Sequence, residues 1–264
     1  MQGSSTEGFT AHNILLDDGT QTYPAAGYLM SQNGILLAAQ RILRLVYPDG
    51  LAGKSIVDIG CLEGGFTTEF ARLGMNATGI EVRESNYRNC LRVKAGTSLP
   101  NLTFIRDDAA NIKHHGPFDV CFVCGLLYHL DEPRKFLTNA ADVCGRVMIL
   151  ETHVARAHES PARHLYGLST LSENEGLPGR WFPEYGEVTT EGLDQLKWAS
   201  YSNSRSFWIQ KEYLLHLLSD LGFDIVLQQF DCDWNIAEQN TTGWRYTHDR
   251  ELLVGIRSSE RARW

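Results

Sequence analysis

Residues Val57–Thr67, VDIGCLEGGFT, place an acid, three glycines and a second acid directly after an apolar run. A glycine-rich turn between a strand and a helix lets the backbone approach a ligand closely, because glycine lacks a Cβ and tolerates positive φ. The spacing of Gly60, Gly64 and Gly65 differs from the G-x-G-x-x-G of a dinucleotide site, and the sequence has no G-x-x-x-x-G-K-[ST] phosphate loop. The turn therefore predicts a nucleotide-like cofactor of another kind.

The segments around this turn follow a regular order. Apolar runs of strand length alternate with helical periods from Ser55 to about His153, which is typical of a parallel sheet. Strands are expected at SIVDIG, ATGIE, LTFI, FDVCFVCG and RVMILE. The first connecting helix should end at Gly74, and a later one should open with Asp131 as N-cap and Pro133 in its first turn. Five strands with four connections predict a doubly wound α/β sheet.

The ends of the chain and one long segment lie outside this alternation. Residues 1–50 are expected to form an N-terminal helical cap, because apolar residues keep helical spacing from Ile35 to Val46, just before Pro48. No period is evident from about 152 to 206, where aromatic residues are mixed with glycine and proline, so we expect a substrate-binding insert or lid there. The helix YLLHLLSDLGF and the strands DIVLQQF and ELLVGIR then resume the fold and bring the expected strands to seven.

Acidic residues discriminate between cofactors. Glu81 follows Asp58 by 81 − 58 = 23 positions, at the end of the second strand, where a carboxylate can accept both ribose hydroxyls of an adenosine. Asp108 follows the third strand and is placed to accept from an adenine amino group. Asp58 is a poor neighbour for a pyrophosphate but a good one for a cation. A cofactor with adenosine, a positive centre, an amino-acid tail and no phosphate is S-adenosylmethionine.

With these residues, Ser55–Glu151 resembles class I S-adenosylmethionine-dependent methyltransferases. The resemblance rests on DIGCLEG from Asp58, on Glu81, on Asp108-Ala109 and on FDVCFVCGLLYHLDEP. It implies a methyltransferase domain at 51–264 with a mostly parallel, seven-stranded, Rossmann-like sheet whose last strand is antiparallel. Leu62 departs from the pattern, since the family usually has its second glycine there. The implied cofactor contacts are Asp58, Gly60, Cys61, Leu62, Gly64, Glu81, Val82, Asp108, Ala109, Cys124 and Gly125.

Candidate catalytic residues lie at the carboxyl edge of the expected sheet. Methyl transfer displaces an already activated sulfonium, so an enzyme supplies alignment and, for a hydroxyl acceptor, a base. His129 follows the fourth strand and His153 follows the fifth, and Glu151 is placed to orient either one. Alternatively, His129 caps Asp131 or packs under the next helix, and His153 lies on a surface loop. His158 and His164 have no identifiable partners, so no metal is expected.

The aromatic residues of the insert allow two interpretations. They either stack on a flat or sugar-like acceptor or pack the insert onto its own small core, and we expect two or three of them to touch substrate. These residues are Trp181, Tyr185, Trp198, Tyr201 and Trp208.

The expected function is methyl transfer to a hydroxyl or amine of a small-molecule acceptor, such as a natural product or a sugar. Segments at Gly125, Asn203 and Arg250 are also similar to bacterial tRNA wobble-uridine carboxymethyltransferases. Those enzymes use a carboxylated cofactor that an arginine and a tyrosine help to hold, and Tyr128 and Arg250 fall at plausible positions. A third alternative is a binding protein that kept the cofactor fold without turnover.

The composition of the chain indicates which classes of partner to expect. A net charge of −8 gives no long-range attraction to a polyanion, so nucleic acid is a less favoured partner. The apolar runs are too short to span a membrane, and the N-terminus, MQGSSTEGF, lacks the pattern of a signal peptide, so we expect a cytoplasmic protein. The six cysteines are scattered, and Cys121 and Cys124 lie in an apolar strand, which favours reduced thiols and core packing. Oligomeric state is left open.

Overall fold

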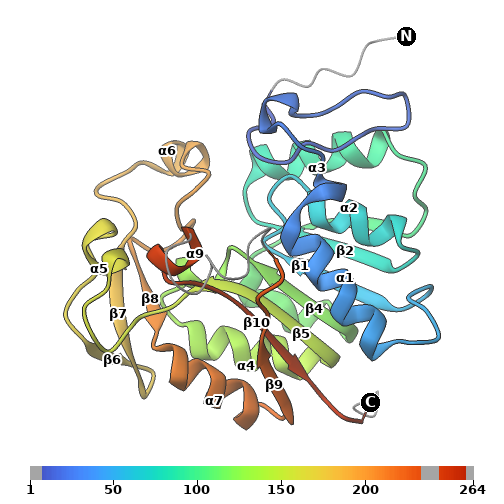
Figure 1. Ribbon diagram of the computed structural model, residues 1–264. Coiled ribbons are helices and arrows are strands. Elements are labelled where there is room, and N and C mark those ends of the chain that lie inside the picture. The colour runs from blue at the N-terminus through green and yellow to red at the C-terminus, as the bar shows by residue number, and fades with distance from the viewer. Residues whose placement is uncertain (1–7, 233–243, 260–264) are drawn as a thin grey trace.

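The computed structural model describes residues 8–232 and 244–259 and contains a seven-stranded sheet in the order β3-β2-β1-β4-β5-β10-β9 (Figure 1). Parts of the expected cap (1–7) and of the main domain (233–243 and 260–264) lie outside the described residues. The first five strands are mutually parallel, and β10 runs antiparallel to both β5 and β9, so the predicted doubly wound sheet is confirmed. The strands are β1 Ser55–Ile59, β2 Asn76–Glu81, β3 Leu102–Arg106, β4 Phe118–Cys124, β5 Cys144–His153, β9 Ile225–Gln228 and β10 Arg250–Ile256.

Helices cover both faces of this sheet (Figure 1). The α1, α2 and α3 side packs with strand residues such as Ile56 and Phe122, whereas α4 and α7 pack with their strand neighbours Val57 and Val123. Both faces are apolar because successive side chains of a strand point to opposite faces, and each face is buried. The helices of the sheet domain are α1 Gly34–Val46, α2 Gly65–Arg72, α3 Glu84–Ala95, α4 Pro133–Val143, α7 Lys211–Asp220 and α9 Trp244–Thr247.

Short 3-10 helices lie in the remaining connections. Among the described residues of the expected N-terminal cap, only α1 is α-helical, and residues 8–33 form two 3-10 turns and irregular backbone. No helix in the described part of the chain is long and apolar enough to cross a membrane. The 3-10 helices are η1 Pro24–Ala26, η2 Met30–Gln32, η3 Ala109–His114 and η4 Leu127–His129.

The segment after β5 contains a second, three-stranded antiparallel sheet in the order β6-β7-β8. Its elements are α5 Pro161–Leu165, β6 Ser172–Asn174, β7 Leu177–Pro183, α6 Thr190–Gln195 and β8 Arg205–Ile209. The expected insert, about 152–206, overlaps the end of β5, which continues to His153, and the start of β8, which continues to Ile209. Helices of five and six residues and a strand of three are too short to produce a readable period.

The start of α4 differs from expectation. Pro133 occupies the first turn as predicted, but the N-cap is Glu132, which makes no side-chain capping bond, so the prediction for Asp131 is wrong. A carboxylate from the second sheet replaces the cap: Glu175 accepts from Arg134 N at 2.8 Å and from Lys135 N at 2.9 Å. This contact fastens the β6–β7 turn to the main domain.

Replacement of Glu175 tests whether its hydrogen bonds to the start of α4 stabilise the protein. The variant Glu175→Gln leaves only one amide oxygen for two backbone donors, so we expect the free energy of unfolding to fall by about 1 kcal/mol, as for loss of an N-cap. Urea denaturation measures the change, with Glu173→Gln on the exposed side of β6 as the matched control. Equal stability of the two variants would contradict the contact.

Candidate active site

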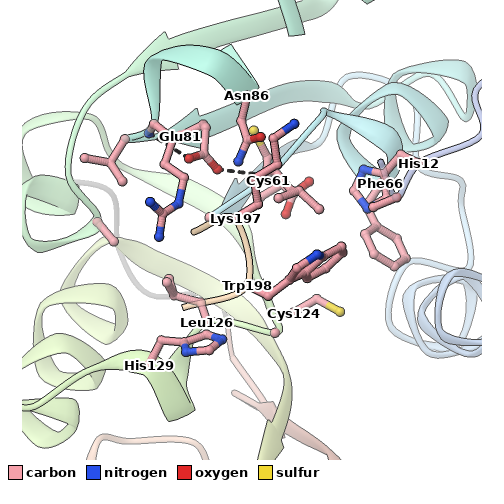
Figure 2. A pocket seen from close by; sticks show the side chains of 18 of the residues that line it. His12, Cys61, Phe66, Glu81, Asn86, Cys124, Leu126, His129, Lys197 and Trp198 are labelled. Carbon is pink, nitrogen blue, oxygen red and sulfur yellow. Dashed lines mark hydrogen bonds between the residues drawn. The ribbon is translucent and has the colours of Figure 1, made fainter. Parts of the chain in front are cut away.

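A cavity of about 550 Å³ opens at the carboxyl ends of β1, β2 and β4, where the strand order reverses (Figure 2). Every expected cofactor contact except Gly64 lines it. Tyr128 and His129 line it as well, whereas His153 does not. The topology therefore gathers residues from four separate strand ends into one site. The expected residues that line the cavity are Asp58, Gly60, Cys61, Leu62, Glu81, Val82, Asp108, Ala109, Cys124, Gly125, Tyr128 and His129.

The turn after β1 keeps a left-handed path in spite of Leu62. Leu62 has φ 53°, between Gly60 at 77° and Gly64 at 79°. A leucine in this region costs roughly 1 kcal/mol relative to glycine, and the Leu62 N–H is held by Glu81 Oε2 at 3.0 Å. Gly64 serves packing, because a Cβ there would come within 2.5 Å of the Phe104 ring. Leucine at this position therefore adds backbone strain to the turn.

Two buried acids join the strand ends to the neighbouring backbone. Asp58 Oδ2 accepts from Thr67 N at 3.1 Å and from Thr67 Oγ1 at 2.6 Å, which ties β1 to the first turn of α2. Glu81 Oε1 accepts from Arg83 N at 2.8 Å (dashed in Figure 2). Burial raises the pKa of both carboxyl groups to about 7. Asp108 begins η3 and accepts from Ala110 N at 2.9 Å.

The N-terminal arm, residues 8–14, completes one wall of the cavity, and sequence reasoning missed it. Glu63, fully buried in the glycine-rich turn, accepts from the N–H groups of Thr10, Ala11 and His12 at 2.7, 3.1 and 3.0 Å. His12 Nδ1 in turn accepts from Gly65 N at 3.0 Å. The arm has no regular secondary structure and is held by one distant carboxylate, so its sequence shows no periodic pattern. The only sign of it in the sequence was Glu63, an acid in the glycine-rich turn that had no assigned role.

His129 forms a pair with a carboxylate from the second sheet. Its Nδ1 lies 2.9 Å from Glu184 Oε1 and 3.1 Å from Oε2, and the Glu184 side chain is only 1% exposed. Glu184 also accepts from Ser200 N at 2.9 Å, and Asn203 Nδ2 donates to the His129 carbonyl at 3.1 Å. His129 therefore faces the cavity with its ring orientation fixed. The insert residue Glu184 was missed because only the tertiary fold brings it to His129.

Both ring nitrogens of His153 have hydrogen-bond partners within the protein. Its Nδ1 lies 2.7 Å from the His248 carbonyl, Arg250 Nη1 lies 3.1 Å from its Nε2, and its ring stacks on Trp208 at 4.5 Å. Burial lowers the pKa of His153 to about 3, so the ring is neutral. The structure thus places His153 away from the cavity, with both nitrogens engaged.

Glu151 and Tyr128 have a common partner in Arg250. Glu151 orients neither histidine, because it accepts from Arg250 Nε at 2.5 Å and from Nη2 at 2.8 Å. The Arg250 guanidinium lies 4.8 Å from the centre of the Tyr128 ring, and burial raises the pKa of Tyr128 to about 12. Tyr128 is therefore a neutral hydroxyl at the cavity wall.

The strap, residues 196–202 between α6 and β8, closes one side of the cavity. Arg83, directly after the β2 end, donates to the carbonyls of Leu193, Ala199 and Ser200, and Lys197 Nζ donates to the Gly8 carbonyl at 2.9 Å. Trp198 is 65% exposed and projects into the cavity in Figure 2. The strap thus connects the insert both to the cofactor half of the site and to the arm.

The five aromatic residues of the insert divide between the two expected roles. Trp198 and Tyr201 line the cavity. Trp208 is 2% exposed and packs with Tyr166 and Phe182, while Trp181 packs on Phe207. Tyr185 does not line the cavity. Two of the five are thus at the cavity, and contact of any of them with a substrate stays a prediction.

Metal and disulfide chemistry find no support in the described residues. Residues 8–232 and 244–259 contain no group of three or more His, Cys, Asp or Glu side chains able to hold a metal ion. All six cysteines are free. Cys121 and Cys124 of β4 face opposite sides of the sheet and pack in the two different cores, and Cys124 also lines the cavity.

Comparison with known proteins agrees with the fold. Residues 56–146 match the family model of a methyltransferase domain. The chain is 29% identical over 107 residues to a ubiquinone biosynthesis O-methyltransferase of Shewanella pealeana, covering 38% of this chain and 45% of that protein. A Cupriavidus pinatubonensis protein of the same name is 33% identical over 104 residues, covering 38% and 41%. These matches thus span less than half the length of either relative.

Solved structures share the fold over nearly the whole chain. The N-terminal domain of EvdMO1 with S-adenosylhomocysteine bound has a TM-score of 0.65 at 22% identity, covering 95% of this chain and 93% of that one. The magnesium protoporphyrin IX methyltransferase of Synechocystis PCC 6803 has a TM-score of 0.55 at 17% identity, covering 85% and 83%. The chain carries a class I S-adenosylmethionine-dependent methyltransferase domain.

We expect the hydrogen bonds of Arg83 to hold the strap in place. In Arg83→Met the side chain keeps its apolar stem but loses three carbonyl contacts, so the strap should open and trypsin should cleave after Lys197 several-fold faster. Mass analysis of a limited digest measures the rate. The control is Arg88→Met, whose side chain is 70% exposed on α3. Unchanged cleavage after Lys197 would show that Arg83 does not hold the strap.

Asp58 should make stability depend on pH. Its pKa is 3.8 in the unfolded chain and about 7 in the fold, so between these values the folded protein keeps a proton that the unfolded chain has lost. The free energy of unfolding therefore falls as pH rises from about 4 to 7, by at most about 1.4 kcal/mol per pH unit. In Asp58→Asn this contribution is absent. Urea denaturation across that range, with exposed Asp220→Asn as control, tests it; a pH-independent difference from wild type would contradict it.

Proposed function

We propose that this protein transfers the methyl group of S-adenosylmethionine to a hydroxyl of a small-molecule acceptor, with His129 as the general base. The observation that carries the proposal is the His129–Glu184 pair in the same cavity as Asp58, Glu81 and Asp108. The acids suit the adenosine and the sulfonium, and the histidine suits an acceptor proton. Cofactor and acceptor would then meet between the strand ends and the strap.

The tautomer of His129 supports this role. An ionised Glu184 only accepts hydrogen bonds, so it holds the His129 proton on Nδ1 and leaves the lone pair on Nε2. As the acceptor oxygen attacks the methyl carbon, Nε2 takes the hydroxyl proton, and the C–S bond electrons return to sulfur to give S-adenosylhomocysteine. Trp198 and Tyr201 of the strap supply aromatic faces for the acceptor and exclude water.

Two acceptor classes are worth testing first. The matching curated relatives are named for an O-methylation step in ubiquinone biosynthesis, which favours phenolic acceptors. EvdMO1 was crystallised with D-fucose, which favours sugars. Aromatic side chains at the cavity wall suit the flat face of either class.

One specific observation favours the alternative of a tRNA-modifying enzyme. Tyr128 and Arg250 both line the cavity, as expected for enzymes that hold a carboxylated cofactor. Arg250 is already paired with Glu151 through two of its nitrogens, so the extra carboxylate would have to share the guanidinium. Preferential binding of the carboxylated cofactor over S-adenosylmethionine, with salt-sensitive RNA binding, would favour this alternative.

The test has two stages. Calorimetric titration of the stripped protein with S-adenosylmethionine, S-adenosylhomocysteine and NAD examines the cofactor, and binding of neither of the first two would refute the proposal. Transfer of labelled methyl groups to a panel of catechols, phenols and sugars then identifies the acceptor class.

His129→Gln should lower kcat by about 10²–10⁴-fold, the usual contribution of a general base, while the Kd for S-adenosylmethionine changes little. Glu184→Gln should lower kcat less, because it only weakens the hold on Nδ1. His216→Gln on the exposed side of α7 is the control. Normal turnover by His129→Gln would remove His129 as the base.

A further inference from the structure

His12 has one ring nitrogen committed to the protein and one directed elsewhere. Because Gly65 N donates to Nδ1 at 3.0 Å, Nδ1 carries the lone pair and the ring proton lies on Nε2. Burial lowers the pKa of His12 to about 4, so the ring keeps this neutral form near pH 7. Among the described residues no partner is found for Nε2, and His12 lines the cavity. The arm therefore offers one N–H donor of fixed orientation to a ligand.

The position of the His12 N–H donor in the cavity bears on which end of the cofactor lies near it. His12 lies beside the first turn of α2, with its ring 5.7 Å from that of Phe66 (Figure 2). The same turn holds Asp58 through Thr67, two residues after Gly65. At the far side of the cavity, the wall at the ends of β2 and β3 carries Glu81, Asp107 and Asp108. Those acids suit hydroxyl and amino groups and repel a carboxylate.

An amino-acid tail carries an ammonium and a carboxylate on one carbon, so it needs an acceptor and a donor close together. Two side chains that the first turn of α2 holds provide both: Asp58 of β1 is the acceptor and His12 of the arm is the donor. The N-terminus of a helix also carries partial positive charge, which favours the carboxylate over a neutral group. We propose that His12 Nε2–H binds the carboxylate of the cofactor's amino-acid tail and makes the N-terminal arm a specificity element for it.

This inference rests on the proposed function, and a pair of ligands separates the two. S-adenosylhomocysteine has the tail carboxylate, whereas its decarboxylated analogue keeps the adenosine, the sulfur and the amine. In the variant His12→Asn, the side-chain oxygen can still accept from Gly65 N, but the donor at Nε2 is gone. A hydrogen bond to a charged group is typically lost with about a tenfold or greater drop in affinity.

Calorimetric titration of the full chain gives the decisive comparison. His12→Asn should weaken S-adenosylhomocysteine by about tenfold or more and leave the decarboxylated analogue within about twofold of wild type. His12→Gln serves as a second variant, and exposed His216→Asn as the control. Because both ligands are measured on the same variant, a general loss of folding cancels in their ratio.

Equal weakening of both ligands would show that His12 only shapes the turn, and unchanged binding of S-adenosylhomocysteine would show no contact; either result overturns the assignment. If the wild type bound neither ligand, the proposed function itself would fail.

Discussion

Buried carboxylates that accept from main-chain N–H groups hold the site together. Glu63 holds the N-terminal arm, Asp58 holds the start of α2, and Glu81 joins the turn after β1 to the backbone just after the end of β2. Glu184, whose side chain is buried, does the same for the strap through Ser200 N. Charge-assisted bonds of this kind are stronger than neutral ones, and each replaces water around a buried charge. Loops without regular structure thereby acquire defined positions around the cavity.

The two halves of the cavity have different origins in the chain. Residues 56–146, which match the methyltransferase model, supply the strand ends and the glycine-rich turn. The arm before them and the insert after them supply His12, Lys197 and Trp198. Both additions reach the site through contacts with the matched segment, at Glu63 and Arg83. The matched segment therefore supplies all the expected cofactor contacts and His129, whereas the added segments supply further walls of the cavity.

The sequence sufficed for features that depend on local pattern or on strand-end position. The parallel strands, the end of α2 before Gly74 and the acids Asp58, Glu81 and Asp108 all follow from periodicity and from the meeting of strand ends. Features that depend on contacts between residues far apart in the sequence could not be predicted. Glu184 is 55 positions from His129, and Glu175 is 41 from Arg134, so no local signal marks either pair. His153 was misplaced because the arginine and the carbonyl that occupy it come from a later strand and its preceding turn.

Arg83 donates its hydrogen bonds to main-chain oxygens of the insert, the carbonyls of Leu193, Ala199 and Ser200. A carbonyl is present whatever side chain the residue carries, so this attachment is indifferent to the identity of those positions. The side chains at these three positions can therefore be exchanged while the hydrogen bonds to Arg83 persist. Such an arrangement suits divergence, since new acceptor preferences can arise by substitution within a loop whose placement is already assured.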